Sequence, residues 1–138
     1  FSIVDLAIED LFLAKYSALK GQQSMLSEHV DDSELSFVIT LNDTFQGGGT
    51  RFVDIADGDT TTDTTVAPTC AGAGVLFCGR RLHVGVEVVE GNRYILAGFV
   101  RVYPSTPEGV AKLESLLKQT SQPTNKQRAG IRMARSDG

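Results

Sequence analysis

The sequence predicts an all-β core, a sandwich or a jelly-roll barrel, followed by one C-terminal helix. Short runs rich in Val, Ile, Phe, Tyr and Thr recur over the first 103 residues, and these residue types favour strands. Clusters of Gly, Asn and Asp separate the runs at close intervals, as turns between strands require. Many short strands joined by close turns are typical of sandwiches and jelly rolls.

Six segments carry the strand pattern. They span residues 11–18, 35–41, 50–55, 74–78, 82–89 and 93–103. The Glu-Gly-Asn sequence at 90–92 predicts a hairpin turn between the last two segments. The Gly47-Gly48-Gly49 run predicts a tight turn, because glycine adopts backbone conformations that other residues avoid. The acidic, Thr-rich segment 57–69 is expected to be a solvated loop.

One helix is predicted near the C-terminus. Thr106 is a favourable N-cap, and Pro107 suits the first helical position. Three apolar residues then recur at helical spacing: Val110, Leu113 and Leu117. Residues 120–138 are polar and basic without an apolar period, so we expect a single domain over residues 1–119 and a disordered basic tail after it.

Composition excludes several classes of function. The chain has 138 residues and a net charge of −4, and residues 1–100 carry 6 Lys/Arg against 14 Asp/Glu. Nucleic acid is therefore a disfavoured partner, because phosphate binding needs a basic face. No apolar run reaches the roughly 18 residues that a membrane span requires. The two histidines and two cysteines do not have the spacing of a zinc finger.

Both histidines are candidates for one metal centre. His29 and Asp31 are two residues apart, so in an extended strand their side chains point to the same side. His83, in another strand-like run, would complete a set of two imidazoles and one carboxylate. That set is the facial triad of non-haem iron(II) enzymes. A His-x-Asp sequence is also common by chance, so this pattern alone does not establish a metal site.

Arg93 is the candidate anion-binding residue. The predicted hairpin at 90–92 would bring it near the base of the same cavity as His83. A guanidinium is suited to a carboxylate, so a dicarboxylate such as 2-oxoglutarate could bind the metal at one end and Arg93 at the other. The spacing is equally compatible with an ion pair between Arg93 and the nearby Glu90.

Five motifs in order resemble the 2-oxoglutarate- and iron(II)-dependent dioxygenases of the prolyl 4-hydroxylase-like branch, especially the procollagen lysyl hydroxylases. The motifs are Ala14-Lys15-Tyr16, His29-Val30-Asp31-Asp32, LNDTFQGGGTRF at 41–52, Gly79-Arg80-Arg81-Leu82-His83 and Gly91-Asn92-Arg93-Tyr94-Ile95. The third resembles the family's LN-x-x-(F/Y)-x-GGG-x-RF segment. The resemblance covers roughly residues 10–103.

The resemblance implies a cupin-like double-stranded β-helix, a jelly roll in which the metal lies between two facing sheets. Carried over by position, His29, Asp31 and His83 match the iron(II) ligands, and Arg93 matches the residue that binds the distal carboxylate of 2-oxoglutarate. Tyr16 matches a cosubstrate-binding tyrosine, although a core aromatic is the alternative for it. No further catalytic side chain is implied. The expected activity is hydroxylation of lysyl or prolyl side chains in a peptide or protein, with dioxygen as oxidant, L-ascorbate as a further cofactor and 2-oxoglutarate converted to succinate.

Two functions of other classes compete with this interpretation. One is a non-catalytic jelly-roll binding module, and the other is a zinc-dependent hydrolase that uses the same three metal ligands. The presence of all three metal ligands together with Arg93 argues against the binding module, and the hydrolase does not explain Arg93 and the order of the motifs. Lysyl hydroxylase-like function would imply the endoplasmic reticulum, but the sequence itself assigns neither a compartment nor an oligomeric state.

Overall fold

The computed structural model describes residues 4–56 and 60–120. It divides into two compact units, one spanning residues 8–102 and one that includes residues 4–7 and 103–120. Antiparallel sheets make up the first unit, and helix α1 (Pro107–Thr120) lies in the second. The expected β core with a C-terminal helix is therefore confirmed. All but the first residue of the predicted disordered tail lies outside the described residues.

The strands form two sheets. The larger contains β1 (Val4–Ser17), β3 (Leu35–Thr40), β4 (Phe45–Gly47), β7 (Gly74–Cys78) and β9 (Val88–Pro104). The smaller contains β2 (Leu26–His29), β5 (Thr50–Ala56), β6 (Thr60–Val66) and β8 (His83–Gly85). The larger sheet has the order β1-β9-β3-β7 with β4 also paired to β9, and the smaller has the order β2-β8-β5-β6.

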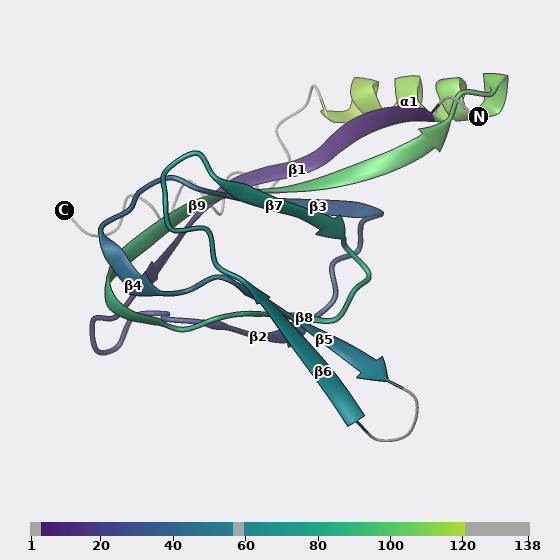
Figure 1. Cartoon of the computed structure of the whole chain (residues 1–138). Coiled ribbons are helices and arrows are strands. Elements are labelled where there is room, and N and C mark those ends of the chain that lie inside the picture. The colour runs from purple at the N-terminus through teal and green to yellow at the C-terminus, as the bar shows by residue number, and fades with distance from the viewer. Residues whose placement is uncertain (1–3, 57–59, 121–138) are drawn as a thin grey trace. The chain divides into compact units, whose positions relative to one another are not determined.

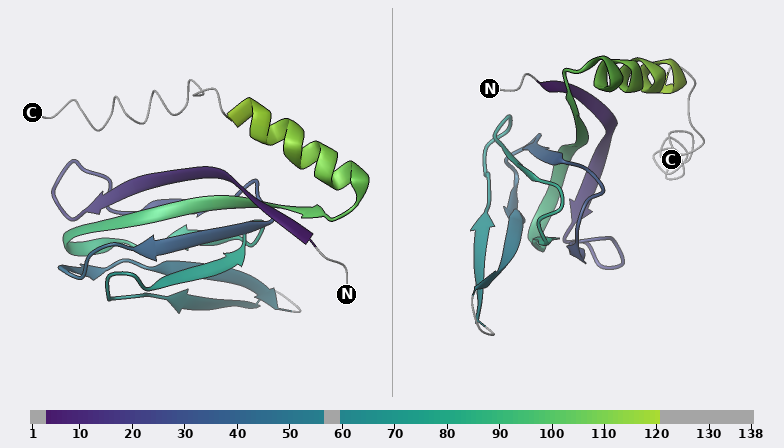
Figure 2. Two further views of the ribbon diagram at one scale, coloured as in Figure 1. Left: turned by 90° about the horizontal axis from the view of Figure 1, so that it is seen from above. Right: turned by 90° about the vertical axis from the view of Figure 1, so that its right-hand side faces the viewer.

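Within residues 8–102 the two sheets form separate layers (Figure 1), and Figure 2 shows their strands from two further directions. Aromatic side chains connect the layers. The ring of Phe77 in β7 lies 5.1 Å from that of Phe52 in β5 and 4.8 Å from that of His83 in β8, measured between centroids. The buried apolar residues of this unit are Phe52, Phe77, Val84, Val88, Ile95, Ala97 and Val100. The core thus lies between the sheets, where the predicted site residues converge.

Several predicted elements are confirmed with small shifts in their ends. The segments 35–41, 50–55 and 74–78 are found as β3, β5 and β7. The predicted first strand is longer and begins at Val4. Helix α1 begins at Pro107, and the Thr106 hydroxyl accepts a hydrogen bond of 3.1 Å from the Gly109 N–H, so Thr106 is the N-cap. No described helix is long and apolar enough to cross a membrane.

The predicted hairpin with a turn at 90–92 is wrong, because these residues belong to the long strand β9. Gly91 adopts a φ of 74° but remains in the ladder, opposite Phe45 of β4. A glycine at this position allows the backbone to bend and also lets β4 approach closely. A Cβ there would lie 2.6 Å from the Thr44 carbonyl oxygen. Residues beyond Asn92 pair with β3, so β9 has different partners on the two sides of the bend.

The segment 57–69 is not the loop that its acidic, polar composition predicts. Residues 60–66 form β6, which pairs with β5 from Thr50↔Val66 to Ala56↔Thr60. Threonine is β-branched and favours strands, so residues 60–66 have a high strand propensity although they are polar. Residues 57–59 lie outside the described residues. The short strands β2 and β4 also escaped prediction, because three or four residues give too little alternation to recognise.

Candidate metal centre and anion-binding cavity

A cavity of about 90 Å³ lies between the two sheets. All five residues singled out from the sequence line it: Tyr16, His29, Asp31, His83 and Arg93. Its remaining lining is mostly apolar and includes Phe12, Leu26, Val38, Phe77, Ile95 and Phe99. The structure therefore brings together residues from four strands and one loop around a single space.

The two histidines are cross-strand neighbours. His29 ends β2 and His83 begins β8, and the register of these antiparallel strands pairs their Cα atoms. The ring centroids are 4.2 Å apart. His83 is 5% exposed, whereas His29 is half-buried at the side of the cavity. The pairing of β2 with β8 thus places two imidazoles at one spot, although the residues are far apart in the sequence.

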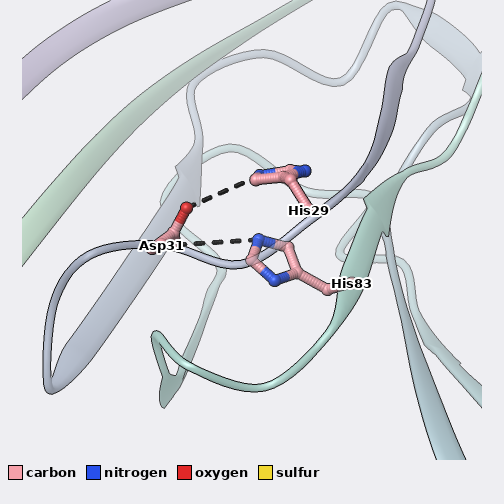
Figure 3. A group of neighbouring side chains, drawn as sticks. All are labelled: His29, Asp31 and His83. Carbon is pink, nitrogen blue, oxygen red and sulfur yellow. Dashed lines mark ion pairs between the residues drawn. The ribbon is translucent and has the colours of Figure 1, made fainter.

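Asp31 completes the cluster, but from a loop and not from the strand that its spacing predicts. Strand β2 ends at His29, and the backbone N–H of Asp31 donates to the Gly79 carbonyl at 2.7 Å. Asp31 Oδ1 lies 3.5 Å from His29 Nε2, and Oδ2 lies 3.6 Å from His83 Nε2. Figure 3 shows the carboxylate facing both rings.

The hydrogen bonds of the imidazoles determine which ring nitrogens are available. His29 Nδ1 lies 2.7 Å from the Ser27 carbonyl oxygen, and His83 Nδ1 lies 2.7 Å from the Arg81 carbonyl oxygen. A carbonyl oxygen can only accept, so each Nδ1 must carry the proton. In the neutral ring, Nε2 then keeps its lone pair, and in both histidines Nε2 is the atom that faces Asp31. Metal-bound histidines are typically oriented by a carbonyl or carboxylate in this way.

The donor set fits a divalent transition metal. One nitrogen from each histidine and one carboxylate oxygen all lie within 4.8 Å of one another. Two ligands bound at about 2.1 Å are roughly 3.0–3.4 Å apart in octahedral or tetrahedral geometry, so a small contraction of the cluster would seat an ion. Two imidazoles and one carboxylate suit iron(II) and zinc alike, and the distances do not separate the two metals.

Arg93 in β9 is a buried cation with only 3% of its surface exposed. Its Nη2 donates to Thr40 Oγ1 at 3.1 Å, but its Nε is buried without a hydrogen-bond partner. No carboxylate forms an ion pair with it among residues 4–56 and 60–120, so the alternative pairing with Glu90 is wrong; Glu90 is exposed. Burial lowers the pKa of Arg93, partly offset by Tyr16. An unpaired buried cation is costly, which favours an anion in this cavity.

The triglycine turn lets the backbone pass close to this arginine. Gly47, Gly48 and Gly49 have φ values of 80°, 73° and 111°. A Cβ on Gly48 would lie 2.9 Å from Arg93 Cδ, closer than real side-chain contacts. On another side, the Arg93 guanidinium carbon lies 5.8 Å from the centroid of the Phe45 ring. Gly48 therefore leaves room for Arg93, and all three glycines allow the chain to turn between β4 and β5.

Tyr16 in β1 lines the cavity and is half-buried. Burial raises the pKa of its hydroxyl, while the positive charge of Arg93 lowers it by a smaller amount. Tyr16 and Arg93 thus line the same cavity and interact electrostatically. The alternatives of a cosubstrate-binding residue and a core aromatic both remain open for it.

Sequence reasoning missed the hydroxyl groups that support both charged groups. Thr40, Ser36 and Ser33 are at most 1% exposed, and Ser36 Oγ donates to Asp31 Oδ2 at 2.6 Å. One signal was available. Ser36 and Thr40 both fall on the inward face of the 35–41 strand, where alternation predicts apolar residues. Polar side chains on an inward face need partners, and here the partners are Asp31 and Arg93.

Comparison of the sequence with protein-family models gives no match, and comparison with curated proteins gives no significant match.

Proposed function

We propose that the chain is an iron(II)- and 2-oxoglutarate-dependent dioxygenase that hydroxylates a lysyl or prolyl side chain of a peptide or protein. In this proposal the two sheets form a double-stranded β-helix. The two-layer arrangement and the position of the cavity between the layers support it. L-ascorbate would serve as a further cofactor, as in the enzymes that the sequence resembles.

The observation that carries the proposal is the presence of two complementary sites in one cavity. One is the cluster of His29, Asp31 and His83, which offers three donors to a cation. The other is Arg93, a buried cation that has no carboxylate partner among the described residues. A ligand that is satisfied by both must bind a metal at one end and carry an anion at the other. 2-Oxoglutarate has these two ends.

Each residue has a distinct role in the proposed reaction. His29, Asp31 and His83 would hold iron(II) and leave coordination positions open. Iron(II) and 2-oxoglutarate, when bound, would supply the oxidising chemistry: one oxygen atom of O₂ would go to the substrate and the other to succinate, with release of carbon dioxide. Arg93 would bind the distal carboxylate of 2-oxoglutarate. The apolar lining excludes water, which strengthens the charge–charge attraction at Arg93.

The competing functions make different use of the same residues. A zinc hydrolase would use the same three metal ligands with a bound water, and a non-catalytic module would need no reaction at the metal. The burial of Arg93 and its unpartnered Nε support a ligand with an anionic end. Turnover of 2-oxoglutarate separates the dioxygenase from both alternatives.

The first test measures metal content and substrate-stimulated succinate formation in the chain loaded anaerobically with iron(II). A panel of lysine- and proline-containing peptides with mass-spectrometric detection of hydroxylation identifies the substrate class. We expect His83→Ala to abolish turnover, because it removes a buried ligand. Zinc binding without 2-oxoglutarate turnover would favour the hydrolase, and substantial turnover by the variant would contradict the ligand assignment.

The second test uses arginine variants. Arg93→Ala should raise the apparent KM for 2-oxoglutarate by about 10- to 100-fold, since a charge-assisted hydrogen bond contributes roughly 1.5–3 kcal/mol. The matched control is Arg51→Ala, because Arg51 is 43% exposed in its side chain and pairs with Asp63 at 3.1 Å. An unchanged KM in the Arg93 variant would remove this residue from the cosubstrate site.

A further inference from the structure

A chain of buried hydroxyl groups lies behind the proposed metal centre. Ser36 Oγ lies 2.6 Å from Asp31 Oδ2, and Ser33 Oγ lies 2.9 Å from Ser36 Oγ. Ser33 is 0% exposed, Ser36 is 1% exposed and Asp31 is 9% exposed. These groups form a continuous polar path from the β2–β3 loop to the inward face of β3.

The direction of the two hydrogen bonds follows from their chemistry. An ionised carboxylate only accepts, so Ser36 must donate its single hydroxyl proton to Asp31. Because Ser36 has no second hydroxyl proton, Ser33 must donate the hydrogen bond between the two serines. The chain therefore runs from Ser33 to Ser36 to Asp31 Oδ2. Hydrogen bonds aligned in one direction polarise and strengthen one another, so Ser33 acts on Asp31 through Ser36.

The surrounding backbone is built to accommodate these serines. A Cβ on Gly79 would lie 2.8 Å from Ser36 Oγ and 2.6 Å from the Ser33 carbonyl oxygen, so a side chain at position 79 would collide with both. Gly79 also accepts the Asp31 N–H at 2.7 Å and donates its own N–H to the Glu34 carbonyl at 3.2 Å. The turn that leads to His83 is thereby tied to the loop that carries Asp31.

We propose that Ser36, supported by Ser33, is a positioning residue that fixes the orientation of the Asp31 carboxylate for metal binding. The inference rests on the proposed metal centre. Each Asp31 oxygen faces one imidazole, Oδ1 at 3.5 Å from His29 Nε2 and Oδ2 at 3.6 Å from His83 Nε2. Ser36 occupies a lone pair of Oδ2, whereas Oδ1 accepts no hydrogen bond from a described side chain. The hydroxyl therefore favours binding of the metal through Oδ1 alone. Binding through one oxygen leaves a further position open for ligands.

The test measures the affinity of the full chain for Mn²⁺ by calorimetry, together with the visible spectrum of the Co²⁺-loaded chain. Outer hydrogen bonds to metal ligands typically change metal affinity by 10- to 100-fold, so Ser36→Ala should weaken Mn²⁺ binding by at least tenfold. Its Co²⁺ bands should shift, because a freed carboxylate changes the number of bound oxygens. Ser33→Ala should weaken Mn²⁺ binding by a smaller factor. Ser36→Thr should bind Mn²⁺ about as tightly as the wild type, because it keeps the hydroxyl.

Ser17→Ala is the matched control. Ser17 is a serine of the same unit, 1% exposed, whose hydroxyl accepts a hydrogen bond of 3.2 Å from the Leu19 N–H and does not contact the cluster. It should leave the Mn²⁺ affinity and the Co²⁺ spectrum unchanged. This control separates the loss of any buried serine from the loss of the hydrogen bond to Asp31.

The outcomes distinguish this inference from the proposed function. A folded Ser36→Ala chain with Mn²⁺ affinity within twofold of the wild type and an unchanged Co²⁺ spectrum would overturn the positioning role alone. If Ser36→Ala does not fold, a folded Ser33→Ala chain with unchanged Mn²⁺ affinity and an unchanged Co²⁺ spectrum would overturn the positioning role. If the wild-type chain binds neither ion, or His83→Ala binds them equally well, the metal centre itself is wrong and the inference fails with it.

Discussion

Asp31 and Arg93 are two buried charges of opposite sign that line one cavity. Asp31 accepts a hydrogen bond from Ser36 and faces the Nε2 atoms of two imidazoles. Arg93 donates to one neutral hydroxyl, and its Nε has no partner. Burial of an incompletely compensated charge costs several kcal/mol, so the protein groups alone leave both ends of the cavity incompletely compensated. A metal at one end and a carboxylate at the other would relieve both.

The titration of Tyr16 predicts how the stability of the fold changes at alkaline pH. Burial raises the pKa of its hydroxyl above 10.0, the ordinary value. The unfolded chain therefore loses this proton near pH 10 while the folded chain retains it, so the free energy of unfolding should fall as the pH rises from that value through the folded pKa. Denaturant unfolding at several pH values checks this. The Tyr16→Phe variant has no hydroxyl to titrate, so its free energy of unfolding should fall less over this pH range.

Arg93 provides the control for that titration. Its positive charge lowers the pKa of Tyr16, so Arg93→Ala should move the tyrosinate transition of Tyr16 to still higher pH. The transition is measured as the difference between the ultraviolet titrations of chains with and without Tyr16. A lower transition pH in the Arg93 variant would show that the two groups do not interact as described.

At the scale of elements, the turn between β4 and β5 is predicted to control the position of Arg93. Gly48→Ala introduces a Cβ 2.9 Å from Arg93 Cδ at a φ of 73°. Beyond a backbone strain of roughly 1–2 kcal/mol, it should displace the guanidinium and raise the KM for 2-oxoglutarate by about tenfold, or ~1.4 kcal/mol. Steady-state kinetics over a range of 2-oxoglutarate concentrations measures this.

Gly21→Ala controls for backbone strain alone. Gly21 has a similar φ of 84°, but a Cβ there would meet nothing within 4 Å. Both variants should lose comparable stability, and only the Gly48 variant should change the KM. Equal KM values in the two variants would mean that the approach of Gly48 to Arg93 does not matter for cosubstrate binding.

The elements also show why part of the fold was predictable from the sequence. Strands such as β3 and β7 carry β-branched and aromatic residues between clear turn residues, so local pattern was sufficient. The segment 90–92 has the composition of a turn, yet pairing with β4 holds it inside β9. Segment 60–66 is polar, yet pairing with β5 makes it a strand. In both cases a partner distant in the sequence decided the structure, and local composition does not report such partners.

The candidate site divides in a similar way. The chain has only two histidines, so His29 and His83 could be selected by residue type, and Asp31 and Arg93 by their spacing and by the motifs in which they stand. The residues that orient them could not, because buried serines and threonines are common and their partners are set by tertiary structure. The alternation of the 35–41 segment marks Ser36 and Thr40 as polar residues on an inward face, but their partners, Asp31 and Arg93, follow only from the tertiary structure.

At the scale of the whole molecule, ligand binding is predicted to stabilise the fold. A metal at 100 times its Kd adds about 2.7 kcal/mol to the free energy of unfolding, if it does not bind the unfolded chain. For a chain of this size that corresponds to a rise in Tm of roughly 10 °C. Differential scanning calorimetry with Mn²⁺ under anaerobic conditions measures it.

Two variants separate the stabilisation caused by Mn²⁺ from the stabilisation caused by 2-oxoglutarate. His83→Ala should lose most of the shift caused by Mn²⁺, because it removes one of the three donors. Arg93→Ala should keep the metal shift but lose the further increase on addition of 2-oxoglutarate. An equal Mn²⁺ shift in the wild type and the His83 variant would place the stabilising ion elsewhere.

The register of β2 and β8 makes metal uptake a measure of correct folding. His29 and His83 lie directly opposite one another, and a slip of one residue would turn one imidazole to the other face of the sheet. The pair exists only after strands that are distant in the chain have met, which is a slow, non-local event in folding. A collapsed chain with the wrong register would contain the same donors but could not present them together. A metal bound at the proposed centre would therefore favour the native register over compact alternatives during folding.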